Sequence, residues 1–192
     1  SDSNIQILNP VVSDKEGYPI LDDTTRLAEA FIAMAKEEIA NGKQVKFVFD
    51  GVDRWLRICW AAMGVDKRAN EVKQPGIAWG KRNKHYEDLI EKITDGLECD
   101  RFFITHMKEV FANVANPTPT GKVPNCRSQT MDKMNQVIEV SRFDVGSKAN
   151  HTATLRGSKT NTELVNKTWT FLTIDNGEVE WNSIKELQEG TL

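Results

Sequence analysis

The segment KQVKFVFDGVDRW, residues 43–55, decides the predicted fold. The five residues before Asp50 are apolar apart from Lys46, which is typical of a buried strand. The run ends at Asp50, and Gly51 follows it. An acid at this point either turns the chain, since Asp-Gly is a common turn pair, or lies at the carboxyl edge of a parallel sheet, where α/β proteins bind their ligands.

The surrounding pattern favours a parallel sheet. A short strand is expected in residues 4–10, and residues 24–39 carry apolar side chains at helical spacing before the strand that ends at Asp50. Strand, helix and strand in this order predict a βαβ unit. A second clear helix over residues 79–96 leads to a strand over residues 99–106, which ends in Thr105 and His106. Two strands thus end in polar groups.

The remainder of the chain has a different pattern. Residues 110–126 contain three prolines and no periodicity, which predicts a long exposed loop. A more antiparallel end region is expected from four strand-like segments, and a short helix is expected at 183–190. The four segments are residues 134–143, 151–159, 167–175 and 177–181.

Composition excludes several classes of protein. The 192 residues carry a net charge of -3 and are 39% hydrophobic, as expected for one globular domain without a global basic field. The longest apolar runs are too short for a membrane span, and the first residues do not resemble a signal peptide. Three cysteines without a CxxC pair, and three histidines without ligand spacing, argue against a disulfide framework or a metal centre built from them. A cytoplasmic protein is the simplest expectation.

Several motifs, in their order, resemble the core of phage-encoded RecA-like P-loop ATPases. They are FVFDGVDRW, WGKRNKHYEDLIEKI, FFITHMKEV, MNQVIEVSRF and the segment from TATLRGSK to GEVEW. The resemblance implies one RecA-like core over residues 1–192, with a mainly parallel sheet flanked by helices and an antiparallel C-terminal portion. It also implies a nucleotide-dependent role in DNA recombination, annealing or replication, with single-stranded DNA on loops and a homo-oligomeric state.

The resemblance also assigns roles to residues. Asp50 corresponds to the Walker B carboxylate, which holds Mg²⁺ beside the phosphates of ATP. Thr105 and His106 would lie near the γ-phosphate, and Arg156 and Lys159 would reach a neighbouring subunit's phosphates. Each has a simpler alternative: a turn for Asp50, a structural histidine for His106, and a solvated turn for the two cations.

One feature of the family is missing. No GxxxxGK[ST] phosphate-binding loop occurs in the 192 residues; the three approximate matches, at Gly80, Gly121 and Gly157, all break the pattern. We therefore expect the C-terminal part of a longer ATPase, or a relative that lost the loop, and no ATPase activity from this chain alone.

Two alternatives come from other functional classes. Asp50 with Glu71 and Lys73 resembles the D…ExK spacing of metal-dependent nucleases, although the ExK segment is predicted to be a loop. The missing phosphate-binding loop favours a non-catalytic interaction module on a degenerate nucleotide-binding fold. Asp53, the next acid after Asp50, is interpreted either as a second site acid or as a helix N-cap.

Overall fold

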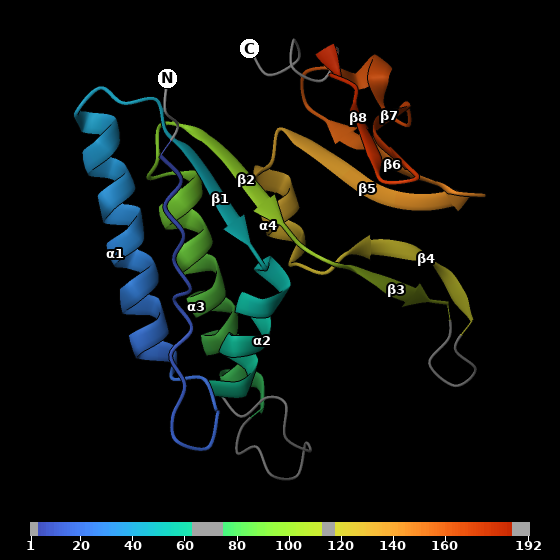
Figure 1. Ribbon diagram of the computed structural model, residues 1–192. Helices are drawn as coiled ribbons and strands as arrows, with labels where there is room; N and C mark the ends of the chain where they lie inside the picture. Colours follow the sequence, from blue (N-terminus) through green and yellow to red (C-terminus); the bar gives the residue numbers. More distant parts are fainter. Residues whose placement is uncertain (1–3, 63–74, 113–117, 186–192) are drawn as a thin grey trace. The chain divides into compact units, whose positions relative to one another are not determined.

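A computed structural model describes residues 4–62, 75–112 and 118–185 (Figure 1). The contacts between residues divide the chain into two compact units, residues 1–130 (unit 1) and residues 131–192 (unit 2).

Three helices form the body of unit 1: α1 (Leu21–Ala40), α2 (Val52–Ala62) and α3 (Pro75–Thr94). Their apolar faces pack into one core, because burying these faces removes a large apolar area from water. The core consists of Leu21, Ala28, Ile32, Ala35, Phe47, Val52, Trp55, Leu56, Ile58, Cys59, Tyr86, Leu89, Ile90, Ile93 and Leu97. The two helices expected over residues 24–39 and 79–96 are therefore present as α1 and α3, which begin three and four residues earlier than predicted.

Two parallel strands lie against these helices. Strand β1 (Lys46–Asp50) pairs in parallel with β2 (Asp100–Ile104), in the register that places Asp50 opposite Ile104. Phe47 of β1 contacts Phe31 of α1 with ring centroids 5.9 Å apart. Side chains therefore alternate along β1, with Phe47 packed into the helical core and Val48 exposed.

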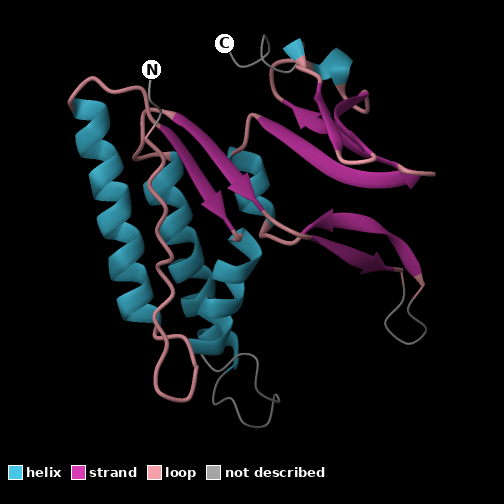
Figure 2. Ribbon diagram, viewed as in Figure 1, coloured by secondary structure: helices cyan, strands magenta, loops and turns pink. Residues whose placement is uncertain are grey.

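A β-hairpin follows β2 directly (Figure 2). Strands β3 (Met107–Phe111) and β4 (Pro119–Pro124) pair in antiparallel fashion. The expected long loop over residues 110–126 is therefore wrong in its described part. Pro119 and Pro124 are compatible with pairing because they occupy the first and last positions of β4, where a missing N–H costs little, and Pro117 lies outside the described residues. Helix α4 (Ser128–Lys133) follows and crosses the boundary between the units.

Unit 2 is built on four antiparallel strands in the order β5-β6-β7-β8. The strands are β5 (Gln136–Val145), β6 (Lys148–Ser158), β7 (Thr168–Asp175) and β8 (Glu178–Trp181), with a short 3-10 helix, η1 (Thr162–Leu164), between β6 and β7. Asn176 and Gly177 join β7 to β8 with positive φ angles of 49° and 87°. This is the Asn-Gly turn that favours tight hairpins, and it explains why these strands were predictable.

The predicted RecA-like, mainly parallel sheet is wrong. Among the described residues, parallel pairing is limited to β1 and β2, and the largest sheet is the antiparallel sheet of unit 2. The chain leaves β2 directly into the β3–β4 hairpin, so the described residues add no further parallel strand to this pair, whereas the antiparallel pairing expected toward the C-terminus is present in β5 to β8. The predicted first strand is also not formed: residues 4–10 are not in a strand, and Ile5 and Ile7 are exposed.

Within the described parts of the chain, no helix is both long and apolar enough to cross a bilayer. The helix expected at 183–190 falls mostly outside the described residues.

Candidate functional site

The carboxyl ends of β1 and β2 bring polar residues from distant parts of the sequence to one edge. Asp50 lies opposite Ile104, and the Gly51 N–H donates to the Ile104 carbonyl at 3.0 Å. Thr105 and His106 follow Ile104 immediately. Parallel pairing in this register therefore places Asp50, Thr105 and His106 at the same end of the strand pair, as predicted for an α/β ligand site.

Gly51 carries the chain from β1 into helix α2. Its φ angle is 96°, which is costly for any residue with a Cβ, and an added Cβ would lie 3.3 Å from Cβ of Arg54. The Gly51 carbonyl accepts the Trp55 N–H at 2.9 Å, which closes the first helical turn. Asp53 lies in this turn, where a carboxylate is favoured by the helix dipole.

Asp53 and His106 form the most informative contact of this edge. His106 Nδ1 lies 3.2 Å from Oδ2 and 3.3 Å from Oδ1 of Asp53. The Asp53 side chain is only 4% exposed, whereas that of His106 is 84% exposed. Arg57, one turn along α2, also approaches Asp53, with Nη2 3.5 Å from Oδ2. The imidazole ring is thus exposed to solvent, and its Nδ1 contacts a buried carboxylate.

The sequence interpretation missed this pair, since it took Asp53 as a helix cap or a second acid. A signal was present. Asp53 is expected in the first turn of the helix after β1, and His106 is expected just after β2. Adjacent parallel strands place both positions at the same edge of the sheet. The contact between Asp53 and His106 could therefore have been predicted by the reasoning that placed Asp50 at this edge.

Thr105 is half-buried, and its hydroxyl is already engaged. Its Oγ1 donates to the Asn125 carbonyl at 3.1 Å, and the Asn125 N–H donates to the His106 carbonyl at 2.8 Å. Asn125 therefore fixes the backbone that carries both residues. The Thr105 oxygen retains acceptor capacity, but its hydrogen is used in this arrangement.

A metal ion could be held here only in part by protein groups. No cluster of three or more His, Cys, Asp or Glu side chains occurs within residues 4–62, 75–112 and 118–185. Asp50 is exposed and presents a single carboxylate at the strand end. Mg²⁺ commonly uses one or two carboxylates, several waters and substrate phosphates, so this donor fits a shared site and does not fit an all-protein cage.

The two cations proposed to act in trans have local partners in unit 2. Arg156 Nε lies 2.6 Å from Oε2 of Glu139 on the neighbouring strand β5. Lys159 donates through Nζ to the carbonyl of Asp132. Both side chains are exposed, and surface contacts of this kind are weak. Each cation can therefore exchange its present partner for another acceptor.

The Gly157–Thr160 segment looks like a phosphate-binding loop in sequence but has other bonds. The Lys159 N–H donates to the Asn135 carbonyl at 2.9 Å. The N–H groups of Thr160 and Asn161 donate to Ser158 Oγ at 3.2 and 2.8 Å. Phosphate cradles depend on backbone N–H groups that point at the ligand. These three point at protein acceptors.

Arg82, in the first half of α3, contacts two tryptophans that also touch each other edge-to-face, with ring centroids 5.4 Å apart. Its guanidinium carbon is 4.9 Å from the ring centroid of Trp60 and 3.7 Å from that of Trp79. Burial, followed by the nearby charge of Arg127, lowers the pKa of Arg82 to about 10. The Trp79 ring thus stacks on the Arg82 guanidinium.

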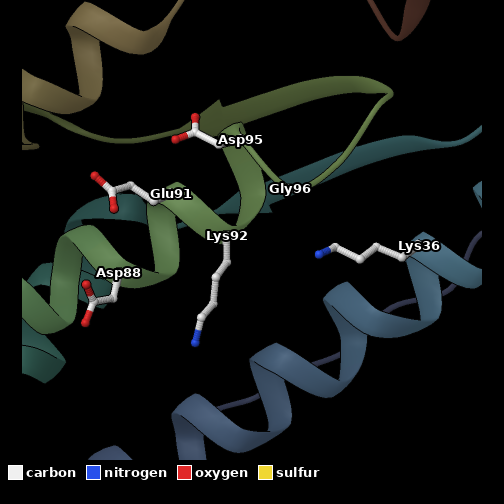
Figure 3. A pocket seen from close by; sticks show the side chains of 6 residues that line it. All are labelled: Lys36, Asp88, Glu91, Lys92, Asp95 and Gly96. Atoms are coloured by element: carbon white, nitrogen blue, oxygen red, sulfur yellow. The ribbon is translucent and has the colours of Figure 1, made fainter.

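A surface hollow of unit 1 lies elsewhere (Figure 3). It has a volume of about 440 Å³ between α1 and α3 and includes Gly96, just before β2 begins, whereas the site described above follows the end of β2. Lys36 and Lys92 project into it, and Lys92 pairs with Glu29. This mixture of opposite charges is typical of a solvated helix surface.

No protein-family model matches this chain, and searches of curated proteins and of solved structures found no significant similarity. Of the predicted residues, the structure brings Asp50, Thr105 and His106 to one edge; Glu71 and Lys73 of the nuclease alternative lie outside the described residues.

Proposed function

We propose that the carboxyl edge of β1 and β2 is the phosphate end of a Mg²⁺-nucleotide site of the ATPase type. The observation that supports this most directly is the parallel register, which brings exposed Asp50 beside the Thr105-His106 segment. Ligand binding outside the carboxyl ends of parallel strands is the general behaviour of α/β proteins.

Each residue has a distinct part in this proposal. Asp50 would hold Mg²⁺, directly or through water, and the ion supplies neutralisation of phosphate charge when it is bound. Thr105 and His106 face the position of the terminal phosphate. Arg156 and Lys159 are proposed to stabilise phosphate charge from a neighbouring subunit of a homo-oligomer.

The role in DNA recombination, annealing or replication rests on the sequence resemblance. The proposed polymer partner is single-stranded DNA. The exposed β3–β4 hairpin, which directly follows His106, contains Lys108 and Lys122 opposite Val123 and Glu109 and is the described segment best placed to meet it. Nucleotide binding additionally needs a phosphate-binding loop, which these 192 residues do not contain.

The test is Asp50→Asn in a protein that includes a phosphate-binding loop. We expect the ATPase rate to fall about a hundredfold or more, because positioning of the metal carries much of phosphoryl transfer. The free energy of unfolding should change by less than about 0.5 kcal/mol, since Asp50 is exposed. Asp22→Asn, an exposed acid of α1, is the matched control. A full-rate Asp50→Asn protein would exclude this function for the edge.

A non-catalytic interaction module is the second candidate. It is favoured by the outer face of the β1–β2 pair, where Val48, Phe102 and Ile104 are all exposed. Parallel strands are normally covered on both faces, so such a face is suited to a partner. A stable protein complex without any nucleotide dependence would support this candidate over the first.

A further inference from the structure

The Asp53–His106 pair defines which ring nitrogen of His106 carries the hydrogen. Ionised carboxylate oxygens only accept hydrogen bonds, so the nitrogen that faces them must be the donor. Both Asp53 oxygens face Nδ1, at 3.2 and 3.3 Å. In a neutral imidazole only one nitrogen carries a hydrogen, and Nε2 therefore presents a lone pair.

The surroundings hold this arrangement in place. Asp53 is buried in the first turn of α2, and Arg57 compensates its charge from 3.5 Å. On the other side, the His106 backbone is anchored through its carbonyl by the Asn125 N–H at 2.8 Å. A histidine held at both its backbone and Nδ1, with a ring that is 84% exposed, presents Nε2 to whatever binds at the edge.

We propose that Asp53 and His106 form a carboxylate–imidazole dyad, in which His106 Nε2 accepts a proton as the general base and Asp53 is its positioning residue. The dyad itself is independent of the proposed function. The identity of the proton donor rests on the proposed function. The donor is the water that attacks the terminal phosphate of a nucleoside triphosphate.

The proposed step is balanced. A water gives a proton to the Nε2 lone pair, while its oxygen forms a bond to the terminal phosphorus. The bond from that phosphorus to the bridging oxygen breaks, and its electron pair leaves with the nucleoside diphosphate. The imidazolium, stabilised by the Asp53 carboxylate at its Nδ1–H, then returns the proton to the phosphate product or to solvent.

This role differs from recognition of a phosphate by hydrogen bonding. A phosphate oxygen needs a donor, and Nε2 of the neutral ring in this tautomer offers only a lone pair. Asp53 is occupied by the imidazole, and the proposed function assigns the second acid of this edge, Asp50, to the metal ion. His106 is thus the described group at the edge best suited to receive a proton.

The dyad is tested without nucleotide, by ¹⁵N NMR of the 192-residue chain. The two ring nitrogens of a neutral histidine have distinct shifts, so the tautomer is measured directly. We expect the Nδ1–H form to dominate for His106, and to lose that dominance in Asp53→Asn, whose amide can donate to Nδ1. His85 and His151 serve as internal references. Dominance of the Nε2–H form in the unaltered chain overturns the dyad, and so does a tautomer unchanged in both Asp53→Asn and Asp53→Ala.

The base role is tested in the ATP-hydrolysing form of the protein, which must include a phosphate-binding loop. His106→Asn should lower kcat by about 10²- to 10⁴-fold, the usual effect of a general base, and change KM by less than about threefold. His85→Asn should leave both unchanged. An unaltered kcat in His106→Asn overturns the base role while the proposed function stands. Absence of hydrolysis in every form, the unaltered protein included, overturns both, and the NMR result then judges the dyad alone.

Discussion

Two of the three sheets in the described residues, β1–β2 and β5–β8, place polar side chains in different ways. Strands β1 and β2 are adjacent in space but separated in sequence by α2 and α3, and their parallel pairing collects Asp50, Thr105 and His106 at one edge. Strands β5 to β8 follow one another, and each pairs with its neighbour. Parallel pairing thus creates an edge at which distant residues meet, whereas consecutive antiparallel strands mainly create contacts between sequence neighbours.

The candidate residues reflect this difference. At the β1–β2 edge, Asp50 and the His106 ring are exposed, and His106 is anchored by a buried acid from another element. In unit 2, Arg156 bonds to Glu139 on the adjacent strand, and Lys159 bonds to the Asp132 carbonyl. The proposed function therefore has its exposed candidate residues in unit 1, and the following predictions can break or sharpen the comparison.

The largest effect is expected from a cavity in unit 2. Leu155 of β6 is fully buried, at 0% exposure. Leu155→Ala should lower the free energy of unfolding by about 2 to 5 kcal/mol, because the transfer free energy of the removed atoms is lost and a cavity is left behind. If the two units are energetically distinct, hydrogen exchange should accelerate more in β5–β8 than in α1–α3. Urea unfolding and hydrogen exchange measure this, with exposed Val140→Ala as the control; uniform acceleration would contradict the division.

An alkaline effect is expected in unit 1. Tyr86 is fully buried and bonds to Thr130 Oγ1 at 2.8 Å, and burial raises the pKa of its phenol from 10.0 to about 12. Between these values the unfolded chain releases the phenolic proton and the native chain retains it. Stability is therefore complete below pH 10 and falls as the pH rises toward 12, by up to about 2 to 3 kcal/mol.

Tyr86→Phe isolates this effect. Between about pH 9 and about pH 11.5, the free energy of unfolding of this variant should decline less, because the part of the decline caused by Tyr86 ionisation is absent. Urea unfolding at the two pH values measures the difference. Tyr18→Phe, the other tyrosine and an exposed one, should keep it. Burial also raises the pKa of the Cys59 thiol from 9.0 to about 12, so Cys59 acts in the same direction and must be kept in both variants. Equal slopes for Tyr86→Phe and Tyr18→Phe would contradict the assignment.

Local patterns explain what could be predicted from the sequence. The apolar spacing of residues 24–39 predicts α1, and the Asn176-Gly177 turn predicts the β7–β8 hairpin, because both depend on neighbouring residues. The β3–β4 hairpin was not predicted, because prolines favour a loop unless it is known that they lie at the ends of a strand. The mainly parallel sheet was wrongly predicted because strand pairing is non-local: residues 4–10 form no strand, although β1 and β2, which are separated by helices, do pair in parallel. The Asp53–His106 contact depends on the same non-local pairing.

The smallest effect is expected when this chain meets ATP alone. A phosphate cradle needs backbone N–H groups and a lysine directed at the ligand. In the Gly157–Thr160 segment, the Lys159 and Thr160 N–H groups donate to Asn135 and to Ser158. Releasing each such bond costs about 1 kcal/mol before any phosphate is bound.

At the carboxyl edge of β1 and β2, Asp50 offers only a carboxylate, which repels phosphate unless Mg²⁺ bridges the two. We therefore expect isothermal titration with ATP and Mg²⁺ to show binding no tighter than roughly millimolar, about -4 kcal/mol, and hydrolysis at the background rate. Micromolar binding would contradict this. Ser158→Ala would then identify the cradle, because it removes the acceptor of the Thr160 and Asn161 N–H groups and should change affinity only if phosphate binds in unit 2.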